Sequence, residues 1–428
     1  MKPGKENILL RSAALADLPE IMDFNVVIHQ DKRVPATIQD LVESGKMAPR
    51  DFLLAKDTIT GKVVSSCCLM PQNILYGGIP LKAGQPELVG TDPGYRKMGL
   101  VSQQFTELHR WSEARGDDVQ LIAGIPNFYR QFGYEMTISL NARRVGSLNT
   151  LDNLPDTAIS MRIEPAVQED IPALISLFAA EAQRVLVAHD WSELDWRYAL
   201  LDNQNDGCAA KKILMIRRPD GTLLGAIKMQ RFIDEDNYFI LGAEIDPALT
   251  SWEEVEPAIL RFYKESVHQA MLAEQKPAPQ VGLQISNNHP LVVRLAHLFP
   301  QENSGYAWFV RVPHLLSFLK KVTPVLDSNL QNSAFAGLNR LIRMNAFSLG
   351  FELEFERGKL TRIDPWQPAS WEDGDFLCPE KVFYHMVFGH RSFAELHAIY
   401  ADCYDKKGAG DVMDALFPKR CSYLYPVI

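Results

Sequence analysis

The sequence lacks several patterns that would indicate other kinds of protein. Its six cysteines form no Cys-x-x-Cys or Cys/His metal spacing, and its ten histidines form no His-x-x-x-His pair or His/carboxylate cluster. No Gly-x-Ser-x-Gly segment and no nucleophilic cysteine context occurs. We therefore expect no metal site and no covalent intermediate on the protein, and we expect the cysteines to be reduced, buried and structural.

Long apolar runs and an excess of positive charge are also missing. No stretch approaches the roughly 18 apolar residues of a membrane span, and charged residues interrupt the first twenty residues, unlike a secretory signal. The 44 Lys and Arg residues against 53 Asp and Glu give a net charge of −9, which argues against nucleic acid as the main partner. These absences predict a cytoplasmic protein without a membrane span.

The length of 428 residues is too great for one hydrophobic core and predicts two to four domains. Residues 8–19 read as a strand, a turn and a helix start, and a related pattern returns at residues 161–172, with Asp17-Leu18-Pro19 and Asp170-Ile171-Pro172 in equivalent places. Such an internal repeat predicts that one fold unit occurs twice.

Turn residues divide both copies into expected strands. The predicted strands are 51–56 and 62–70 in the first copy, before a turn at Gly77-Gly78, and 212–217, 223–230 and 238–245 in the second. Beyond residue 310 the pattern changes, and predicts a helix over 313–322, a strand over 347–356, and two short helices over 380–388 and 393–400.

One segment of the first copy predicts an anion site. A short β-prone run, residues 88–91, is ended by Asp92-Pro93-Gly94, and a stretch with apolar residues at helical spacing begins near Leu100. The first backbone N–H groups of such a helix are unpaired and point, with the helix dipole, at whatever lies in front of them. This arrangement is typical of phosphate binding.

The residue types of this turn fit a pyrophosphate. Gly99 lets the backbone approach a ligand closely because it has no Cβ, and Arg96 and Lys97 add positive charge. The alternative interpretation is a strand-to-helix loop with a solvated basic pair and a packing glycine.

The wider context resembles the GNAT superfamily of N-acetyltransferases. Thr91, Pro93, Arg96 and Gly99 fit the first part of its V/T-x-P-x-x-R-x-x-G-x-G/A signature, and residues 128–135, FYRQFGYE, are similar to its distal F-Y-x-x-x-G-F/Y-E motif. Val101 departs from the usual small residue. An R-x-x-G-L-L-like turn and an E-L-H-R segment, here residues 107–110, resemble the enhanced-intracellular-survival subfamily.

The resemblance implies an α/β (α+β) fold with two GNAT units in tandem, each with a mixed, mostly antiparallel sheet flanked by helices. It implies a catalytic domain over 1–150, a GNAT-like domain over 151–312 and a domain similar to sterol carrier proteins over 313–428, in a protein that forms homo-oligomers. Residues 246–252 of the second copy offer no Arg-x-x-Gly. We therefore interpret the second copy as a degenerate unit that serves as scaffold and pocket wall.

The resemblance also implies roles for individual residues, with acetyl-CoA as co-substrate. Backbone amides of the CoA-binding strand would bind the pantetheine arm, the turn before the helix would bind the pyrophosphate, and Tyr129 would protonate the departing sulfur. The implied CoA-binding residues are Val89, Thr91, Arg96, Lys97, Gly99, Leu100 and Val101.

The general base is left open by the sequence. Where the subfamily has a histidine seven residues before the tyrosine, this chain has Ile122, which takes no proton. The subfamily's other group is the C-terminal carboxylate, here that of Ile428. Glu87 and Asp23 are further candidates, although we interpret both as surface carboxylates.

Four other side chains are expected to have no catalytic role. We expect Tyr134 to be structural and His109 to be an exposed helix residue, and the spacing of His385 and His390 places them on different helix faces.

The predicted function is transfer of an acetyl group from acetyl-CoA to a primary amine, of an aminoglycoside-like molecule or a lysine side chain, by direct attack in a ternary complex. The net negative charge is compatible with a cationic amine. The alternative is a catalytically decayed scaffold of the same origin that binds an apolar ligand. Intact Arg96, Gly99 and Tyr129 argue against this alternative, whereas Ile122 leaves it open.

Overall fold

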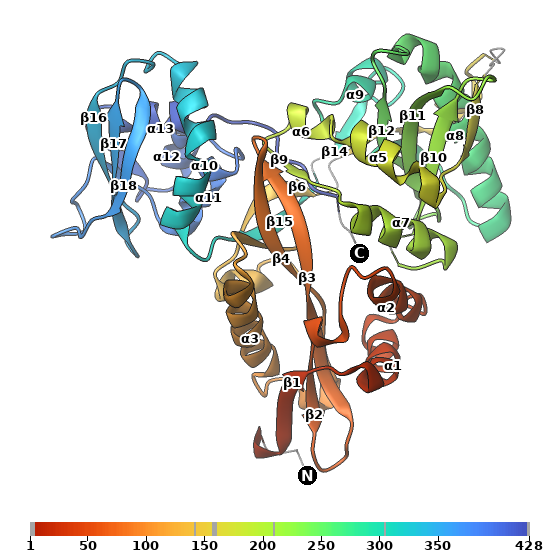
Figure 1. Cartoon of the computed structure of the whole chain (residues 1–428), viewed down its shortest axis with the longest axis horizontal. Coiled ribbons are helices and arrows are strands. Elements are labelled where there is room, and N and C mark those ends of the chain that lie inside the picture. Colours follow the sequence, from red (N-terminus) through yellow and green to blue (C-terminus); the bar gives the residue numbers. More distant parts are fainter. Residues whose placement is uncertain (1–4, 141–142, 156–160, 209, 304, 426–428) are drawn as a thin grey trace.

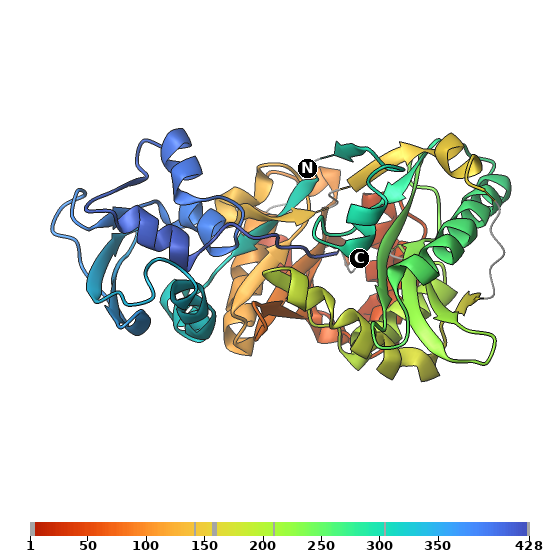
Figure 2. The same cartoon turned by 90° about the horizontal axis from the view of Figure 1, so that it is seen from above.

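The chain folds around three β-sheets (Figure 1). Each sheet and the helices that pack on it form one unit, and we call these the first, second and third units. The computed structural model describes residues 5–140, 143–155, 161–208, 210–303 and 305–425. Seen from above, the first unit lies between the other two (Figure 2). None of the helices in this described part of the chain combines the length and apolar composition that crossing a bilayer requires.

The first sheet carries α1 (Leu18–His29) and α2 (Val34–Glu43) on one side and α3 (Leu100–Arg115) on the other (Figure 1). Its strands lie in the order β1 (Ile8–Ser12), β2 (Phe52–Asp57), β3 (Val63–Tyr76), β4 (Ile79–Thr91), β5 (Val119–Ile122), β15 (Tyr306–Arg311), β6 (Glu135–Leu140), and β9 (Val187–His189) pairs with the end of β3. Among the described strands of this sheet, only β4 and β5 pair in parallel. The mixed, mostly antiparallel sheet predicted from the sequence is confirmed.

The second sheet repeats this plan. Its strands lie in the order β14 (Gln301–Asn303), β7 (Arg143–Ser147), β13 (Gln280–Leu283), β12 (Asn237–Ile245), β11 (Leu223–Gln230), β10 (Lys211–Arg217), β8 (Arg162–Pro165). Its helices are α4 (Leu148–Asp152), α5 (Ile171–Phe178), α6 (Glu181–Arg184), α7 (Glu193–Gln204), α8 (Trp252–Glu274) and α9 (Pro290–Arg294).

The repeat extends to single side chains. Asp17 accepts a hydrogen bond from the N–H of Ala14 at 2.7 Å, and Asp170 accepts one from the N–H of Val167 at 3.1 Å. Each aspartate closes the turn between the first strand of its unit and the following helix. The internal repeat predicted from the two Asp-x-Pro segments is therefore confirmed.

The first two sheets exchange one strand each. β15 follows the whole second unit in sequence, yet it pairs with β5 and β6 in the first sheet. β7 comes before the second unit, yet it pairs with β13 and β14. The boundaries predicted at residues 150 and 312 therefore do not separate the strands of the two sheets, and the division into three domains stays a prediction.

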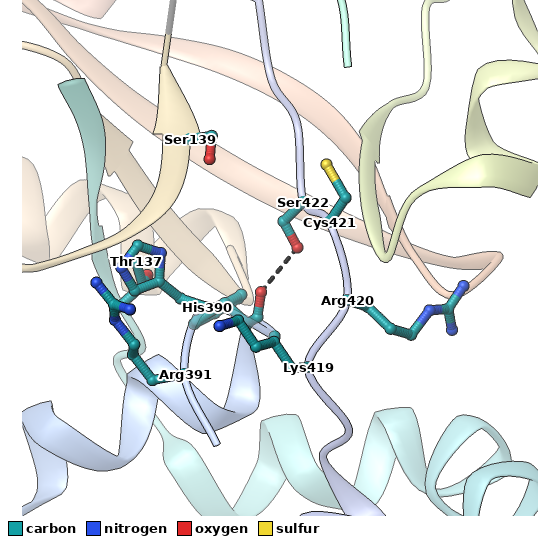
Figure 3. A pocket seen from close by; sticks show the side chains of 10 residues that line it. Thr137, Ser139, His390, Arg391, Lys419, Arg420, Cys421 and Ser422 are labelled. Atoms are coloured by element: carbon teal, nitrogen blue, oxygen red, sulfur yellow. Dashed lines mark hydrogen bonds between the residues drawn. The ribbon is translucent and has the colours of Figure 1, made fainter. Parts of the chain in front are cut away.

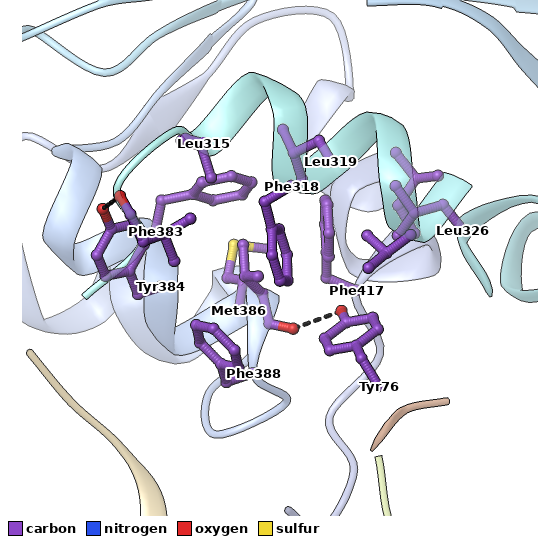
Figure 4. Packing of buried hydrophobic residues seen from close by; sticks show 14 of the residues in the cluster. Tyr76, Leu315, Phe318, Leu319, Leu326, Phe383, Tyr384, Met386, Phe388 and Phe417 are labelled. Atoms are coloured by element: carbon purple, nitrogen blue, oxygen red, sulfur yellow. Dashed lines mark hydrogen bonds between the residues drawn. The ribbon is translucent and has the colours of Figure 1, made fainter. Parts of the chain in front are cut away.

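The third unit shares a core with the first. Its sheet has the order β18 (Lys359–Pro365), β17 (Gly350–Glu356), β16 (Arg340–Asn345), β19 (Phe376–Leu377), β20 (Tyr404–Asp405), and its helices are α10 (Leu315–Gln331), α11 (Glu380–Val387), α12 (Phe393–Ile399) and α13 (Ala409–Leu416). Tyr76, at the end of β3, packs edge-on against Phe318 at 5.5 Å and donates its hydroxyl to the carbonyl of Val387 at 2.6 Å (Figure 4). A continuous apolar core thus joins the two units.

The tail after α13 runs between the units. Tyr423 donates its hydroxyl to the carbonyl of Gln284 in the second unit at 2.7 Å, and Trp308 of β15 donates its indole N–H to the carbonyl of Leu424 at 3.0 Å. Tyr423 and Leu424 are buried, so these contacts place the tail in the interior. Ile428 and its carboxylate lie outside the described residues.

Candidate active site

The sheet of the first unit opens between β4 and β5. The two strands pair only at Ala83 and Gly84, although β4 continues to Thr91. Leu88 has a left-handed φ of 51°, and the register between β3 and β4 shifts beside it. A bulge of this kind bends the strand and leaves backbone groups without a ladder partner. Beyond Gly84, β4 therefore has a backbone edge that β5 does not occupy.

The strand, turn and helix predicted after this edge are confirmed. A short 3-10 turn, Pro93–Tyr95, follows β4, and α3 begins at Leu100. Lys97 and Gly99 both take left-handed conformations, with φ of 66° and 77°. The N–H groups of the first turn of α3 have no acceptor within the helix, so they and the helix dipole favour a negative charge in front of Gly99.

The side chains of the turn divide into exposed and anchored ones. Arg96 and Lys97 are exposed and form no ion pair with any described residue. Leu100 is buried against Ala55 and Val64, which fixes the start of α3. A Cβ added at Gly99 would point into open space, so the left-handed backbone, and no crowding, is what favours glycine here.

The end of β4 is held by hydroxyl contacts. The hydroxyl of Ser65 donates to the carbonyl of Gly90 at 2.7 Å and lies 2.8 Å from the hydroxyl of Thr91. Val89 packs in the same apolar cluster as Leu108 of α3. The end of β4 is therefore held to β3 by these hydroxyl contacts and to α3 by the packing of Val89.

Tyr129 lies in a 3-10 helix, Phe128–Phe132, that follows β5. It is 4% exposed, and its ring lies 5.6 Å from those of Phe105 and Phe309. Burial raises the pKa of Tyr129 above its usual value, and the negative charge of Glu87 raises it further. The phenol therefore keeps its proton at neutral pH.

Gly124 makes room for this ring. A Cβ placed on Gly124 would lie 2.7 Å from Cε2 and 3.2 Å from the hydroxyl oxygen of Tyr129. Real Cβ atoms do not approach other atoms so closely, so any other residue would displace the tyrosine. Sequence reasoning did not identify this glycine, although it lies only five residues before Tyr129.

Glu87 is not the surface carboxylate that the sequence interpretation favoured. The residue lies on β4 directly before the bulge and is half-buried, and burial raises the pKa of its carboxyl group to about 7. Hydrogen bonds from the Gln85 side chain, at 2.8 Å, and from the N–H of Leu88 oppose this rise. Asp23, in contrast, is exposed on α1 as expected.

His109 also differs from its predicted exposure. Its Nε2 lies 3.2 Å from the hydroxyl of Tyr134, which donates in turn to Oε1 of Gln120 at 2.6 Å. Burial, with a smaller effect of the charge on Arg311, lowers the pKa of His109 to about 4. Tyr134 is fully buried. Ile122 of β5 is also buried and packs in the same aromatic cluster.

The prediction that His385 and His390 lie on different faces of one helix is wrong, because α11 ends between them and the chain turns back at Gly389, whose φ is 71°. Their rings are 5.3 Å apart, and Nε2 of His385 lies 3.8 Å from Glu135 of β6. His390 borders a groove of about 310 Å³ between the first and third units, where Ser422 donates to the carbonyl of Phe388 at 2.8 Å (Figure 3).

A cavity of about 580 Å³ lies where the loop after α1 meets the second unit. Arg33 of the first unit, Arg231 and Asp234 of the β11–β12 hairpin, and Tyr425 of the tail line it. Sequence reasoning did not find this cavity, because its walls come from three distant parts of the chain.

The second unit lacks the cradle, as the sequence predicted. Between β12 and α8, residues 246–251 contain no glycine, and none of these described residues has a left-handed conformation. Within the described part of the chain, no group of three His, Cys, Asp or Glu side chains is arranged to hold a metal ion.

Comparisons with known proteins support this description. Residues 10–137 match the family model described as an acetyltransferase (GNAT) domain. A sequence comparison with curated proteins finds no match.

Solved structures share the fold over nearly the whole chain. They include a probable N-acyltransferase from Enterococcus faecalis V583 (13% identity, 97% of this chain and 98% of that chain, TM-score 0.70). A GCN5-related N-acetyltransferase from Anabaena variabilis (13%, 97% and 99%, TM-score 0.65) and Eis1 from Mycobacterium abscessus (14%, 97% and 99%, TM-score 0.60) are also similar. At these identities the likeness establishes the fold of all three units.

Proposed function

We propose that this protein is an acetyl-CoA-dependent N-acetyltransferase of the enhanced-intracellular-survival type that acetylates a primary amine. The observation that carries the proposal is the opening of the first sheet between β4 and β5, which leads to a left-handed turn at the start of α3. The GNAT match over residues 10–137 supports it.

Acetyl-CoA would bind along this opening. The N–H and C=O groups of Val89 and Thr91 lie on the part of β4 that β5 does not pair, so they would bind the pantetheine arm in the manner of a strand. The amides of Gly99, Leu100 and Val101 would bind the pyrophosphate together with Arg96 and Lys97. The two basic side chains are available for this because they are exposed and have no described ion-pair partner.

Tyr129 is the proposed general acid. The amine nitrogen attacks the thioester carbonyl, the C–S bond breaks, and the thiolate takes the phenolic proton, which solvent restores afterwards. A thiol has an ordinary pKa near 8.5, far below that of a buried phenol. The contribution of Tyr129 therefore does not come from its acidity. It comes from a hydroxyl that is held in place and that carries its proton at neutral pH.

Glu87 is the proposed general base. A primary ammonium group must lose a proton before or during attack, and a carboxylate with a pKa of about 7 is suited to accept it. The C-terminal carboxylate of Ile428 stays the alternative base predicted from the sequence. The second unit would form the far wall of the acceptor site. Four statements stay predictions: the identity of the amine, the similarity of the third unit to sterol carrier proteins, the homo-oligomer and the cytoplasmic location.

The rival function is a decayed scaffold whose third unit carries an apolar ligand. The third unit's interior argues against it, because Phe383 and Phe417 pack edge-on at 5.3 Å and Phe376 and Phe393 lie 5.0 Å apart. Aromatic side chains thus occupy space that such a ligand would need.

Acetyl-CoA turnover with a panel of primary amines, measured by thiol release, tests the proposal. We expect release that depends on the amine and is lost in Arg96→Glu, with Asp23→Asn as a control on the same unit. An absence of acetyl-CoA binding by calorimetry in the folded parent protein would remove the proposal, whereas binding without turnover by any amine would favour the scaffold.

A further inference from the structure

Glu87 is connected to the second unit by a buried series of polar contacts. Three hydrogen bonds and one ion pair form it: Gln85 Nε2 to Glu87 Oε1 at 2.8 Å, Gln72 Nε2 to Gln85 Oε1 at 2.9 Å, Lys46 Nζ to Gln72 Oε1 at 3.2 Å, and Lys46 with Asp195. The four residues beyond Glu87 are each 7% exposed or less. Asp195 belongs to α7, whereas the others belong to the first unit.

The far end of the series is held rigidly. Asp195 is the third residue of α7, and its Oδ2 accepts hydrogen bonds from the N–H of Ser192 at 2.8 Å and from its hydroxyl at 2.5 Å. Oδ1 is left to face Lys46. Burial works against the charge of Asp195, but Lys46 and Ser192 outweigh it and hold the pKa of Asp195 below its usual value.

The direction of the hydrogen bonds follows from this end. An ammonium group donates and cannot accept, so Lys46 obliges Gln72 to present its amide oxygen. The NH₂ group of Gln72 then faces Gln85, which must in turn present its own oxygen. The NH₂ group of Gln85 is therefore the group that faces Glu87, and a donor in this position favours the ionised carboxylate.

We propose that Lys46 and Asp195 act, through the two glutamines, as positioning residues for Glu87. The second unit would thus do more than form a wall, because a helix of that unit sets the basicity and orientation of the group that takes the amine's proton. This inference rests on the proposed role of Glu87. A merely structural role of the series would leave the titration of Glu87 unchanged.

Two other titratable groups respond to Glu87 and must be separated from it. They are Cys68 on β3 and Tyr129 after β5, and burial raises the pKa of both thiol and phenol. Neither loses a proton near neutral pH. His29 of α1 hydrogen-bonds the backbone of Leu88, next to Glu87, and burial lowers the pKa of its imidazole below the usual value. An acidic limb in the pH profile of kcat/KM is therefore assigned to Glu87 only where it disappears with that carboxyl group. The variant Glu87→Gln, which has no titrating group, shows whether that assignment holds.

The test replaces the buried ion pair by apolar residues of similar size, Lys46→Met with Asp195→Leu, a change that proteins often tolerate. A second variant, Gln85→Met, removes the last donor. The matched control is Asn205→Ala, because Asn205 directly follows α7, donates to Asp40 of α2 across the same two units at 2.6 Å, and forms no described hydrogen bond with the series that ends at Glu87. Folding is checked by circular dichroism, and CoA affinity by calorimetry.

We expect both test variants to move the acidic limb of kcat/KM upward by roughly one pH unit, with CoA affinity unchanged. Gln85→Met removes the donor to the carboxylate, and the double variant removes the ammonium group that orients this donor. The control should leave the limb in place. A second readout needs no amine: the stability gain of Glu87→Gln levels off at the folded-state pKa of Glu87, so the pH at which it levels off should rise by a similar amount in the double variant and in Gln85→Met.

Each outcome decides something. The positioning role is overturned if folded Gln85→Met leaves unmoved both the acidic limb and the pH at which the stability gain of Glu87→Gln levels off. Loss of the limb in Glu87→Gln would still support Glu87 as the general base. A limb that survives in Glu87→Gln removes the base and the positioning role together. If the double variant does not fold, Gln85→Met alone decides the inference.

Discussion

Replacement of Glu87 by glutamine should stabilise the protein while it removes activity. The substitution keeps the size of the side chain and an oxygen that accepts from Gln85, but it removes the charge that burial disfavours. A pKa raised from about 4.5 to about 7 corresponds to ~3 kcal/mol between the two protonation states. Because the residue is only half-buried, we expect a gain of about 2 kcal/mol at pH 8.

The sign depends on pH in a defined way. Between the unfolded and folded pKa values of Glu87, the folded state keeps a proton that the unfolded chain releases, so rising pH weakens the fold until about pH 7. Below pH 4 both states are protonated, and glutamine gives no advantage. The gain should therefore grow between roughly pH 4.5 and 7 and stay constant above that.

Urea unfolding of the parent, Glu87→Gln and the exposed-site control Asp23→Asn, at pH 5, 6, 7 and 8, measures this. The control should lie within about 0.5 kcal/mol of the parent at every pH. The claim that Glu87 is a buried carboxylate of raised pKa would be refuted if the Glu87→Gln variant were less stable than the parent at pH 8. It would also be refuted if the change in the free energy of unfolding were the same at pH 5 and pH 8.

Five further changes test the other parts of the site. Arg96→Glu should abolish acetyl-CoA binding in calorimetry without unfolding the protein, and unchanged affinity would contradict the phosphate cradle. Gly99→Val should weaken binding through the left-handed backbone, which circular dichroism separates from global unfolding. Tyr129→Phe should lower kcat by about 10²-fold with little change in CoA affinity, and an equally fast variant would make the tyrosine structural. Gly124→Ala should lower kcat through displacement of the same ring, so no additional loss is expected when it is combined with Tyr129→Phe. Deletion of residues 426–428 should reduce the rate far more than the stability if the chain end supplies a base, and full activity would rule the tail out.

Local signals allowed the prediction of the fold's pieces. Proline and glycine at residues 92–94 and 99 stop a strand and start a helix by restricting or freeing φ, so the cradle turn was visible in the sequence. The repeat was predicted because the same Asp-x-Pro pattern occurs at the corresponding place in both copies. The strand expected at 347–356 begins only at Gly350, and the helix expected over 313–322 extends from Leu315 to Gln331 despite a proline at 324.

What could not be predicted depends on distant contacts. The burial of Glu87 and His109 results from packing of other elements around them, and no pattern of neighbouring residues records it. The exchange of β7 and β15 is a choice between two similar sheet edges, to which local β propensity is indifferent. The polar series from Asp195 to Glu87 could not be predicted either, because its members come from residues 46, 72, 85 and 195, which are distant in the sequence.

The exchanged strand β15 has a consequence for the order in which the protein can fold. The gap between β5 and β6 is filled by residues that leave the ribosome after the entire second unit, so the first sheet has two unpaired inner edges until Arg311 has been synthesised. Pairing across so long a sequence separation is slow, and open edges invite association with other chains. Synthesis at about 5–20 residues per second leaves such edges exposed for roughly 10 to 30 seconds. A fragment that ends at residue 150 would keep them permanently, so the amino-terminal unit is dependent on the rest of the chain for its own completion.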